Sequence, residues 1–182
     1  MNKKRIIFGI LIVVWMFTIF IFSSENGQES TQTSDVITTK MVNKEEIKQN
    51  TIKSVVVNEN SITEEEKEIV DKKTEKEYKE KKDEVSYIVR KTAHFIIYMI
   101  GGILVFNFTK TFTNNNIKCI VMSIAFCFIY SISDELHQYF VSERSAEIKD
   151  VILDTIGASI GGISNAYIIK VKKSLKKSIL TY

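Results

Sequence analysis

The stretch IIFGILIVVWMFTIFIF at residues 6–22 decides the class of fold, because it runs for seventeen residues without a charged side chain. A helix of about this length is near the lower limit for crossing a hydrocarbon core of about 30 Å. Lys3, Lys4 and Arg5 precede it, as the basic start of a secretory signal would. The apolar run is longer than a typical signal core and no A-x-A-like cleavage site follows it. The sequence therefore predicts an uncleaved membrane anchor.

Three further apolar stretches follow, at residues 92–108, 117–133 and 151–169. Each is long enough to span a membrane, although the last is interrupted by Asp154 and is rich in Gly and Ser. The average hydropathy resembles that of a soluble protein because residues 64–84 are mostly charged. The pattern predicts an all-α fold, a four-helix transmembrane bundle with one long polar insertion. Such a chain has membrane lipid as a partner.

Basic residues predict the orientation of this bundle. They lie at the N-terminus, around the 109–116 loop and in the tail from Lys170 to Lys177. Four spans bring these three segments to one side, and the positive-inside rule makes that side cytoplasmic. We therefore expect a multi-pass protein of the bacterial cell membrane with both termini in the cytoplasm. Segments 23–91 and 134–150 are then extracytoplasmic.

The chain divides into a first transmembrane helix at 1–24, an extracytoplasmic insertion at 25–86 and a core with three spans and a basic tail at 87–182. Residues 23–60 have few large apolar side chains, which predicts a mobile segment. Residues 63–84 are typical of a charged helix, and a solvated spacer is favoured over a binding element. Its signals are a capping box, Thr63 with Glu66, and the i,i+4 pairs Glu68–Lys72, Glu75–Lys79 and Glu77–Lys81.

The two cysteines are predicted to be inert. Cys119 and Cys127 are eight residues apart in one apolar run, about 12 Å along a helix, which is too far for a disulfide. Each is expected to pack as a small hydrophobic side chain.

Polar residues gather where the last three spans meet the outer side. They are Arg90, His94 and Tyr98 at the start of the second span, Asp134, Glu135, His137 and Gln138 at the end of the third, Arg144 in the loop, and Asp150 and Asp154 in the fourth. Spacings of four place the first three on one face. Spacings of three and four place Asp134 on one face with His137 and Gln138, while Glu135 points elsewhere. Gly157 and Gly161 form a small-xxx-small pattern that lets helices approach closely.

An ionisable side chain at this depth costs about 1–3 kcal/mol unless it is paired or hydrated. Three helices each place one there, so we expect one polar pocket between them, open to the outside. Blander interpretations remain for each piece. Arg90 and Lys91 could mark the membrane interface, His94 could be a packing residue, and Asp154 could bridge helices.

These residues also carry a family resemblance. The strings FSS at 22–24, RKTAHFIIY at 90–98 and SDELHQYFVSERSAEIKDVILDTIGASIGG at 133–162 resemble the VanZ-like membrane proteins. The resemblance covers the four spans and omits the insertion. It implies a bacterial envelope protein of a family named for low-level resistance to the glycopeptide teicoplanin. It also singles out Ser23, Ser24 and Lys91 beside the pocket residues above.

Two departures from the family pattern bear on the pocket. Ile97 stands where relatives commonly have an acidic residue, which removes a carboxylate. Ser142 and Glu143 stand where relatives tend to have Pro-Gly, which implies a differently shaped loop.

Three functions stay open at this point. The pocket could bind or shield an envelope lipid, a lipid-linked cell-wall precursor or a glycopeptide, with Arg90, Lys91 and Arg144 bonding to phosphate. It could instead be the active site of a hydrolase or transferase acting on a lipid-linked phosphate or sugar, with His94 or His137 as base or nucleophile.

The third function is purely structural, with the polar cluster locking the bundle. A variant of the enzyme has a metal between His94, Asp134, His137 and Asp154, but no compact motif such as HExxH occurs, so no metal or other cofactor is assigned. No nucleic-acid partner is predicted.

Overall fold

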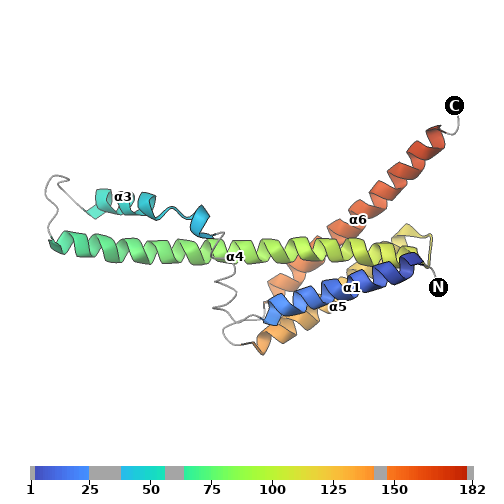
Figure 1. Ribbon diagram of the computed structural model, residues 1–182, viewed down its shortest axis with the longest axis horizontal. Helices are drawn as coiled ribbons and strands as arrows, with labels where there is room; N and C mark the ends of the chain where they lie inside the picture. Colours follow the sequence, from blue (N-terminus) through green and yellow to red (C-terminus); the bar gives the residue numbers. More distant parts are fainter. Residues whose placement is uncertain (1–2, 25–37, 56–63, 142–146, 180–182) are drawn as a thin grey trace. The chain divides into compact units, whose positions relative to one another are not determined.

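The computed structural model describes residues 3–24, 38–55, 64–141 and 147–179. All the secondary-structure elements in these ranges are helices (Figure 1). The helices are α1 (Lys3–Ser24), α3 (Lys44–Val55), α4 (Glu64–Lys110), α5 (Asn116–Tyr139) and α6 (Ile148–Ile179). Within these ranges no residue belongs to a β-strand. Four helices, α1, α4, α5 and α6, are long and apolar enough to cross a membrane. The predicted all-α fold is confirmed, and each of the four predicted spans lies in one of these four helices.

The chain forms two compact units, which are described separately. The first contains Met1–Gly27 and Lys91–Tyr182, and the second contains Gln28–Arg90. Helix α4 is continuous through both, so the charged helix predicted at 63–84 and the second span are one helix of 47 residues.

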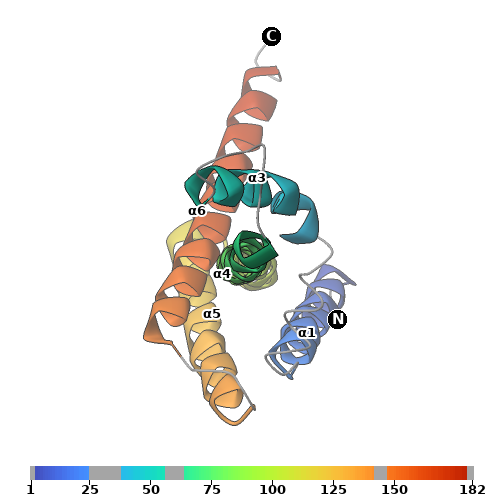
Figure 2. The same cartoon turned by 90° about the vertical axis from the view of Figure 1, so that its left-hand side faces the viewer.

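In the first unit, α1, α5 and α6 pack around the 91–110 part of α4 (Figure 2). Trp15 of α1 lies at the centre of the core, where its indole Nε1 donates to the Ile97 carbonyl oxygen at 2.8 Å. Its ring contacts Tyr98 edge-on, with ring centroids 5.6 Å apart. The hydroxyl of Tyr130 donates to the Met16 carbonyl oxygen at 2.6 Å. Side-chain bonds to backbone carbonyls therefore fix α1 against both α4 and α5.

Small residues set the distance between α4 and its neighbours. A Cβ added at Gly101 would overlap the Trp15 ring, and one added at Gly102 would overlap the backbone at Ala158 of α6. The cysteines belong to the same tightly packed interior: Cys119 and Cys127 are buried and unbridged. The prediction that they are inert packing residues is thus confirmed for their pairing and burial.

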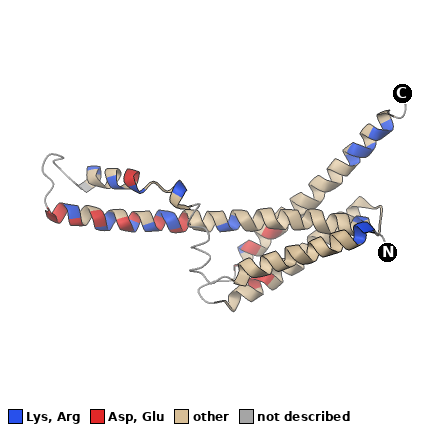
Figure 3. Cartoon of the chain, viewed as in Figure 1, with Lys and Arg blue, Asp and Glu red and all other residues tan. Residues whose placement is uncertain are grey.

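The two ends of the first unit differ in charge (Figure 3). At one end the Arg5 guanidinium bonds to the Thr111 carbonyl oxygen and lies over the Phe112 ring, 3.7 Å from its centroid. Ala166 of α6 packs against Cys119 near this end, so the lysines that follow in α6 extend beyond it. The acidic residues of α5 and α6 lie at the opposite end. The three basic segments therefore share one end of the bundle.

The surface of α1 that does not face the core is apolar. Val13, Phe17 and Phe20 are among its exposed side chains, with Val13 64% exposed. Water is a poor solvent for such a stripe, whereas lipid chains cover it without cost. This surface fits a helix that contacts lipid.

The second unit differs from the sequence-based expectation in two places. Residues 44–55, in the segment predicted to be mobile, form α3. Asn43 Oδ1 accepts from the backbone N–H groups of Glu45 and Glu46, and Ile47 is 3% exposed. A helix cap and one apolar face thus stabilise a helix that the polar composition of this segment does not predict.

The second difference concerns the ion pairs of α4. The pairs Glu68–Lys72 and Glu77–Lys81 form at 2.7 and 2.9 Å. Glu75 pairs with Lys44 of α3 instead of Lys79, because α3 runs antiparallel to this part of α4 and also joins Lys48 to Asp71. The predicted cap Thr63 lies outside the described residues.

Candidate functional site

Three helices of the first unit each bring one ionisable side chain to the acidic end of the bundle. These are His94 of α4, Asp134 of α5 and Asp154 of α6, and each offers one potential ligand atom within 4.8 Å of the other two. His94 Nδ1 lies 4.0 Å from Asp134 Oδ2. The His94 side chain is 22% exposed and that of Asp134 is 3% exposed, while Asp154 is fully buried. The imidazole is therefore the most accessible group of a largely enclosed cluster.

Neighbouring polar groups orient the two carboxylates. Gln138 Nε2, one turn along α5, donates to Asp134 Oδ2 at 3.1 Å. Ser131 Oγ donates to Asp154 Oδ2 at 2.8 Å across the α5–α6 contact. Tyr98, one turn beyond His94 on α4, is buried with its ring 6.5 Å from the imidazole and nearly parallel to it. The phenol closes the inner side of the cluster.

A second set of charged groups links the same three helices. Lys91 forms ion pairs with Asp150 and, at 3.4 Å, with Glu147. Glu135 is buried, and its Oε2 accepts from the backbone N–H of Glu147 at 2.9 Å. Lys91 of α4 is thus tied by ion pairs to the start of α6. Glu135 of α5 fixes the same start through its bond to the Glu147 backbone.

His137 does not join this cluster. Its Nε2 lies 3.1 Å from Ser24 Oγ, and its ring stacks on Phe20 with centroids 4.8 Å apart. Both partners belong to α1, so the face of α5 that carries His137 is turned toward α1, not toward α4 and α6. The metal variant that included His137 is therefore wrong about that ligand. The contact does bring Ser24 and His137, two residues singled out by the resemblance, side by side.

The other predicted residues lie as follows. Arg90 is half-buried and is the last residue of the second unit. Arg144 lies outside the described residues. Gly157 and Gly161 line the crossing of α6 over α4, where an added Cβ would overlap the carbonyl oxygens of Phe95 and Met99. The glycines are thus the reason why Asp154 comes close to His94.

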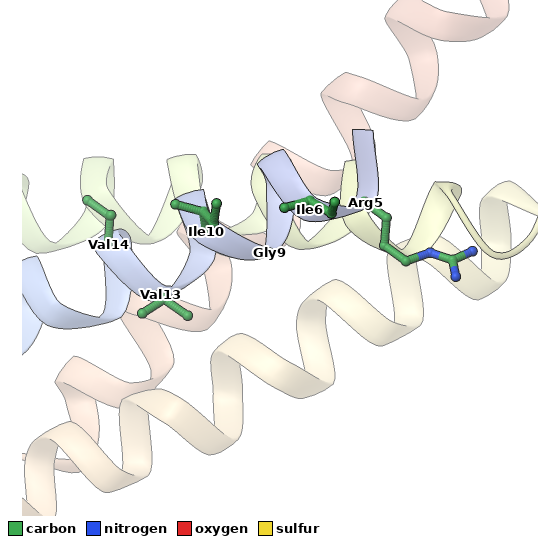
Figure 4. A pocket seen from close by; sticks show the side chains of 6 residues that line it. All are labelled: Arg5, Ile6, Gly9, Ile10, Val13 and Val14. Carbon is green, nitrogen blue, oxygen red and sulfur yellow. The ribbon is translucent and has the colours of Figure 1, made fainter. Parts of the chain in front are cut away.

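A surface hollow of about 410 Å³ lies at the basic end of the bundle, away from this cluster (Figure 4). Six residues of α1 line it, and apart from Arg5 they are Ile6, Gly9, Ile10, Val13 and Val14. Such a lining suits a lipid chain and offers no group for acid–base or metal chemistry.

Two members of the polar site are not apparent from spacing alone. Ser131 stands one turn before Glu135 in an apolar run, and nothing local marks it as the donor to Asp154. Glu147 precedes α6, and its partnership with Lys91 depends on how α4 and α6 cross. The only local signal for either residue is a polar side chain near the end of a span.

Long apolar helices and a shared polar end define a helical membrane protein with a His-Asp-Asp cluster whose two carboxylates are buried. Residues 8–169 match the family model described as VanZ/LLP1. The chain therefore belongs to the VanZ/LLP1 family, as the resemblance predicted. Neither the curated proteins nor the solved structures contain a significant match to this chain.

Proposed function

We propose that the protein is a multi-pass envelope protein that binds or shields an envelope lipid or a lipid-linked cell-wall precursor. The binding site would be the polar end of the bundle, which would face the outside while both termini stay in the cytoplasm. By occupying such a ligand, the protein would lower the sensitivity of the cell to lipoglycopeptides of the teicoplanin type. The observation that supports this proposal is the convergence of His94, Asp134 and Asp154 from three helices.

The chemistry of the cluster favours a ligand rich in donors. Carboxylates accept hydrogen bonds and the imidazole can either donate or accept. Sugar hydroxyls, amides and ammonium groups of a cell-wall precursor offer such donors. Lys91 adds a charge-assisted donor at the rim, although in this structure it bonds to Asp150 and Glu147. Envelope head groups lie within reach of a site at this depth only if this end of the bundle faces outward.

The test is a glycopeptide susceptibility assay in a bacterium that lacks the protein. Expression of the wild type should raise the inhibitory concentration of teicoplanin more than that of vancomycin, which has no lipid tail. Single replacement of His94, Asp134 or Asp154 by Ala should abolish the difference while the amount of protein in the membrane stays unchanged. Asp83→Ala, which removes an exposed acidic residue of the second unit, is the matched control and should behave as wild type.

Loss of membrane protein in all three variants, with Asp83→Ala normal, would instead support a structural role for the cluster. Full resistance in all three variants at normal protein level would refute the proposal. A direct measurement completes the test, in which purified protein in lipid nanodiscs is titrated with a lipid-linked precursor. The wild type should bind and the three variants should not.

Enzymatic action on a lipid-linked phosphate or sugar is the second candidate. The observation that favours it is the proximity of His94 Nδ1 to Asp134 Oδ2, at 4.0 Å. A side-chain rotation that shortens this distance would let the carboxylate orient the imidazole as a general base. Incubation of the purified protein with lipid-linked precursors, followed by mass spectrometry, should then reveal a product. Absence of any product, with and without added divalent metals, would rule out this candidate.

A further inference from the structure

The His94–Asp134–Asp154 cluster has the composition of a metal site. One nitrogen and two carboxylate oxygens come from three different helices, and they meet where two of the three residues are buried. Exposed acidic groups gather on many proteins without binding anything, but here the two aspartate residues, Asp134 and Asp154, are both buried. Burial of a carboxylate is costly unless a cation or several donors stabilise it.

The Asp154 carboxylate supplies the second observation. Its Oδ2 accepts from Ser131, but its Oδ1 is buried and accepts no hydrogen bond from the described residues. A buried, unsatisfied carboxylate oxygen is rare in folded proteins and requires an explanation. A cation bound within the cluster would satisfy this oxygen, and it would also explain why three helices each bring a ligand atom to the same place.

We propose that His94, Asp134 and Asp154 bind one divalent transition-metal ion of the Zn²⁺ or Mn²⁺ class. Imidazole suits Zn²⁺ and carboxylate oxygen suits either ion. Two ligands of one such ion lie at most about 4.2 Å apart, because each bond is about 2.1 Å long. The three atoms lie within 4.8 Å of one another, so rotations of the side chains suffice and the helices need not move.

The groups around the cluster have the arrangement of a second coordination shell. Gln138 and Ser131 each hold one carboxylate by a hydrogen bond, and such outer partners orient metal ligands. Three protein ligands would leave at least one coordination position for a water or an exogenous group. His94 is partly exposed, so this position would be reached from the His94 side.

The cation also changes which ligand the site prefers. Carboxylates alone repel a phosphate, whereas a bound divalent ion attracts it and coordinates its oxygens. The ion would therefore direct the site toward the phosphate or pyrophosphate of a lipid-linked precursor. This last step rests on the proposed function, whereas binding of the ion does not.

The experiment measures metal binding to the full-length protein in nanodiscs, with any purification tag removed. After treatment with a chelator, the protein is dialysed against Zn²⁺ or Mn²⁺ and the bound metal is counted by mass spectrometry. We expect one ion per chain and a higher midpoint of thermal unfolding. His94→Ala, Asp134→Asn and Asp154→Asn should lose the ion and the shift. Failure of the wild type to bind either metal would overturn the proposal.

Matched variants keep the test decisive if a ligand variant fails to fold. His137→Ala removes the other histidine of the chain and should bind metal as the wild type does. Ser131→Ala removes one hydroxyl that holds Asp154, and it should weaken binding about 10–100-fold. Ser133 bonds through its hydroxyl to the Ile129 carbonyl within α5, so Ser133→Ala should leave affinity unchanged. Equal metal binding by Ser131→Ala and Ser133→Ala would contradict the assignment.

Precursor binding in the same nanodiscs separates the two proposals. Metal bound without any precursor binding would leave the cation site standing and refute the proposed function. Precursor bound equally well before and after chelation would refute the role of the metal and leave the proposed function intact.

Discussion

Replacement of Gly157 by alanine is expected to loosen the crossing between α4 and α6 and to disturb the polar site with it. Gly157 lies one turn beyond Asp154 on α6, where the helix passes over the backbone of Phe95. An added Cβ would lie 2.5 Å from the Phe95 carbonyl oxygen and 3.3 Å from its ring. The carbonyl belongs to the α4 backbone and cannot rotate away, so the two helices must separate.

The magnitude follows from two opposing effects. The Cβ would need nearly 1 Å more room, and overpacking of this kind costs about 1–3 kcal/mol. Alanine favours the helix over glycine by about 1 kcal/mol. The free energy of unfolding should therefore fall by up to about 2 kcal/mol relative to wild type, whereas a glycine-to-alanine change without a clash should raise it by about 1 kcal/mol. Because the same displacement moves Asp154 away from His94, metal affinity should fall as well.

The assay is unfolding in mixed detergent micelles, followed through the fluorescence of Trp15. This is the single tryptophan of the chain, and it is buried in the core of the first unit. Gly9→Ala is the matched control, because its Cβ would lie an ordinary 3.6 Å from the Phe108 ring, and it should be as stable as wild type or slightly more stable. If Gly157→Ala were as stable as Gly9→Ala, the reasoning from close helix approach would be refuted.

Three further outcomes are expected. Trp15→Phe removes the indole hydrogen bond to the α4 backbone and should lower the free energy of unfolding by about 1 kcal/mol. The measurement is unfolding followed by circular dichroism. An unchanged free energy would mean that water replaces the lost bond. Lys48→Gln breaks an exposed ion pair with Asp71 and should change the free energy of unfolding by less than about 1 kcal/mol. A larger loss would show that α3 depends on this pair. In a variant without the native cysteines, an impermeant maleimide should label intact cells at Asn60→Cys but not at Asn114→Cys, and labelling of both would contradict the proposed orientation.

The spans of this protein are predictable from sequence because each is a long uncharged run, a signal that needs no tertiary information. The helical character of the charged segment is equally local, since it depends on spacings of four along one helix. The helix α3 is not predictable in the same way. Its apolar face is narrow, with Ile47 at the centre. This face is buried only when the neighbouring part of α4 covers it, and that contact cannot be read from the 44–55 sequence alone.

The site is predictable in part for the same reason. Spacing places His94 with Tyr98 on one face, and Asp134 with both His137 and Gln138 on another. The structure has His94 beside Tyr98 and Asp134 bonded to Gln138, but His137 contacts α1 instead. Spacing does not reveal which neighbour each face meets. His137 is only one position from Gln138 along α5, a rotation of about 100°, and this rotation carries its ring to α1. Only the packing of α1 against α5 distinguishes the two.

The order of residues along α6 links packing to chemistry. Asp154, Gly157 and Gly161 follow one another on the face of α6 that meets α4. A larger residue at either glycine would hold the helices apart, and the fully buried Asp154 would then lose the imidazole across the gap. The close approach therefore encloses a carboxylate that the bilayer would otherwise reject. A bundle that only needed stability would pack equally well with an apolar side chain there. Retention of an acidic group at the tightest crossing of the unit is the strongest physical argument that this end of the bundle binds something.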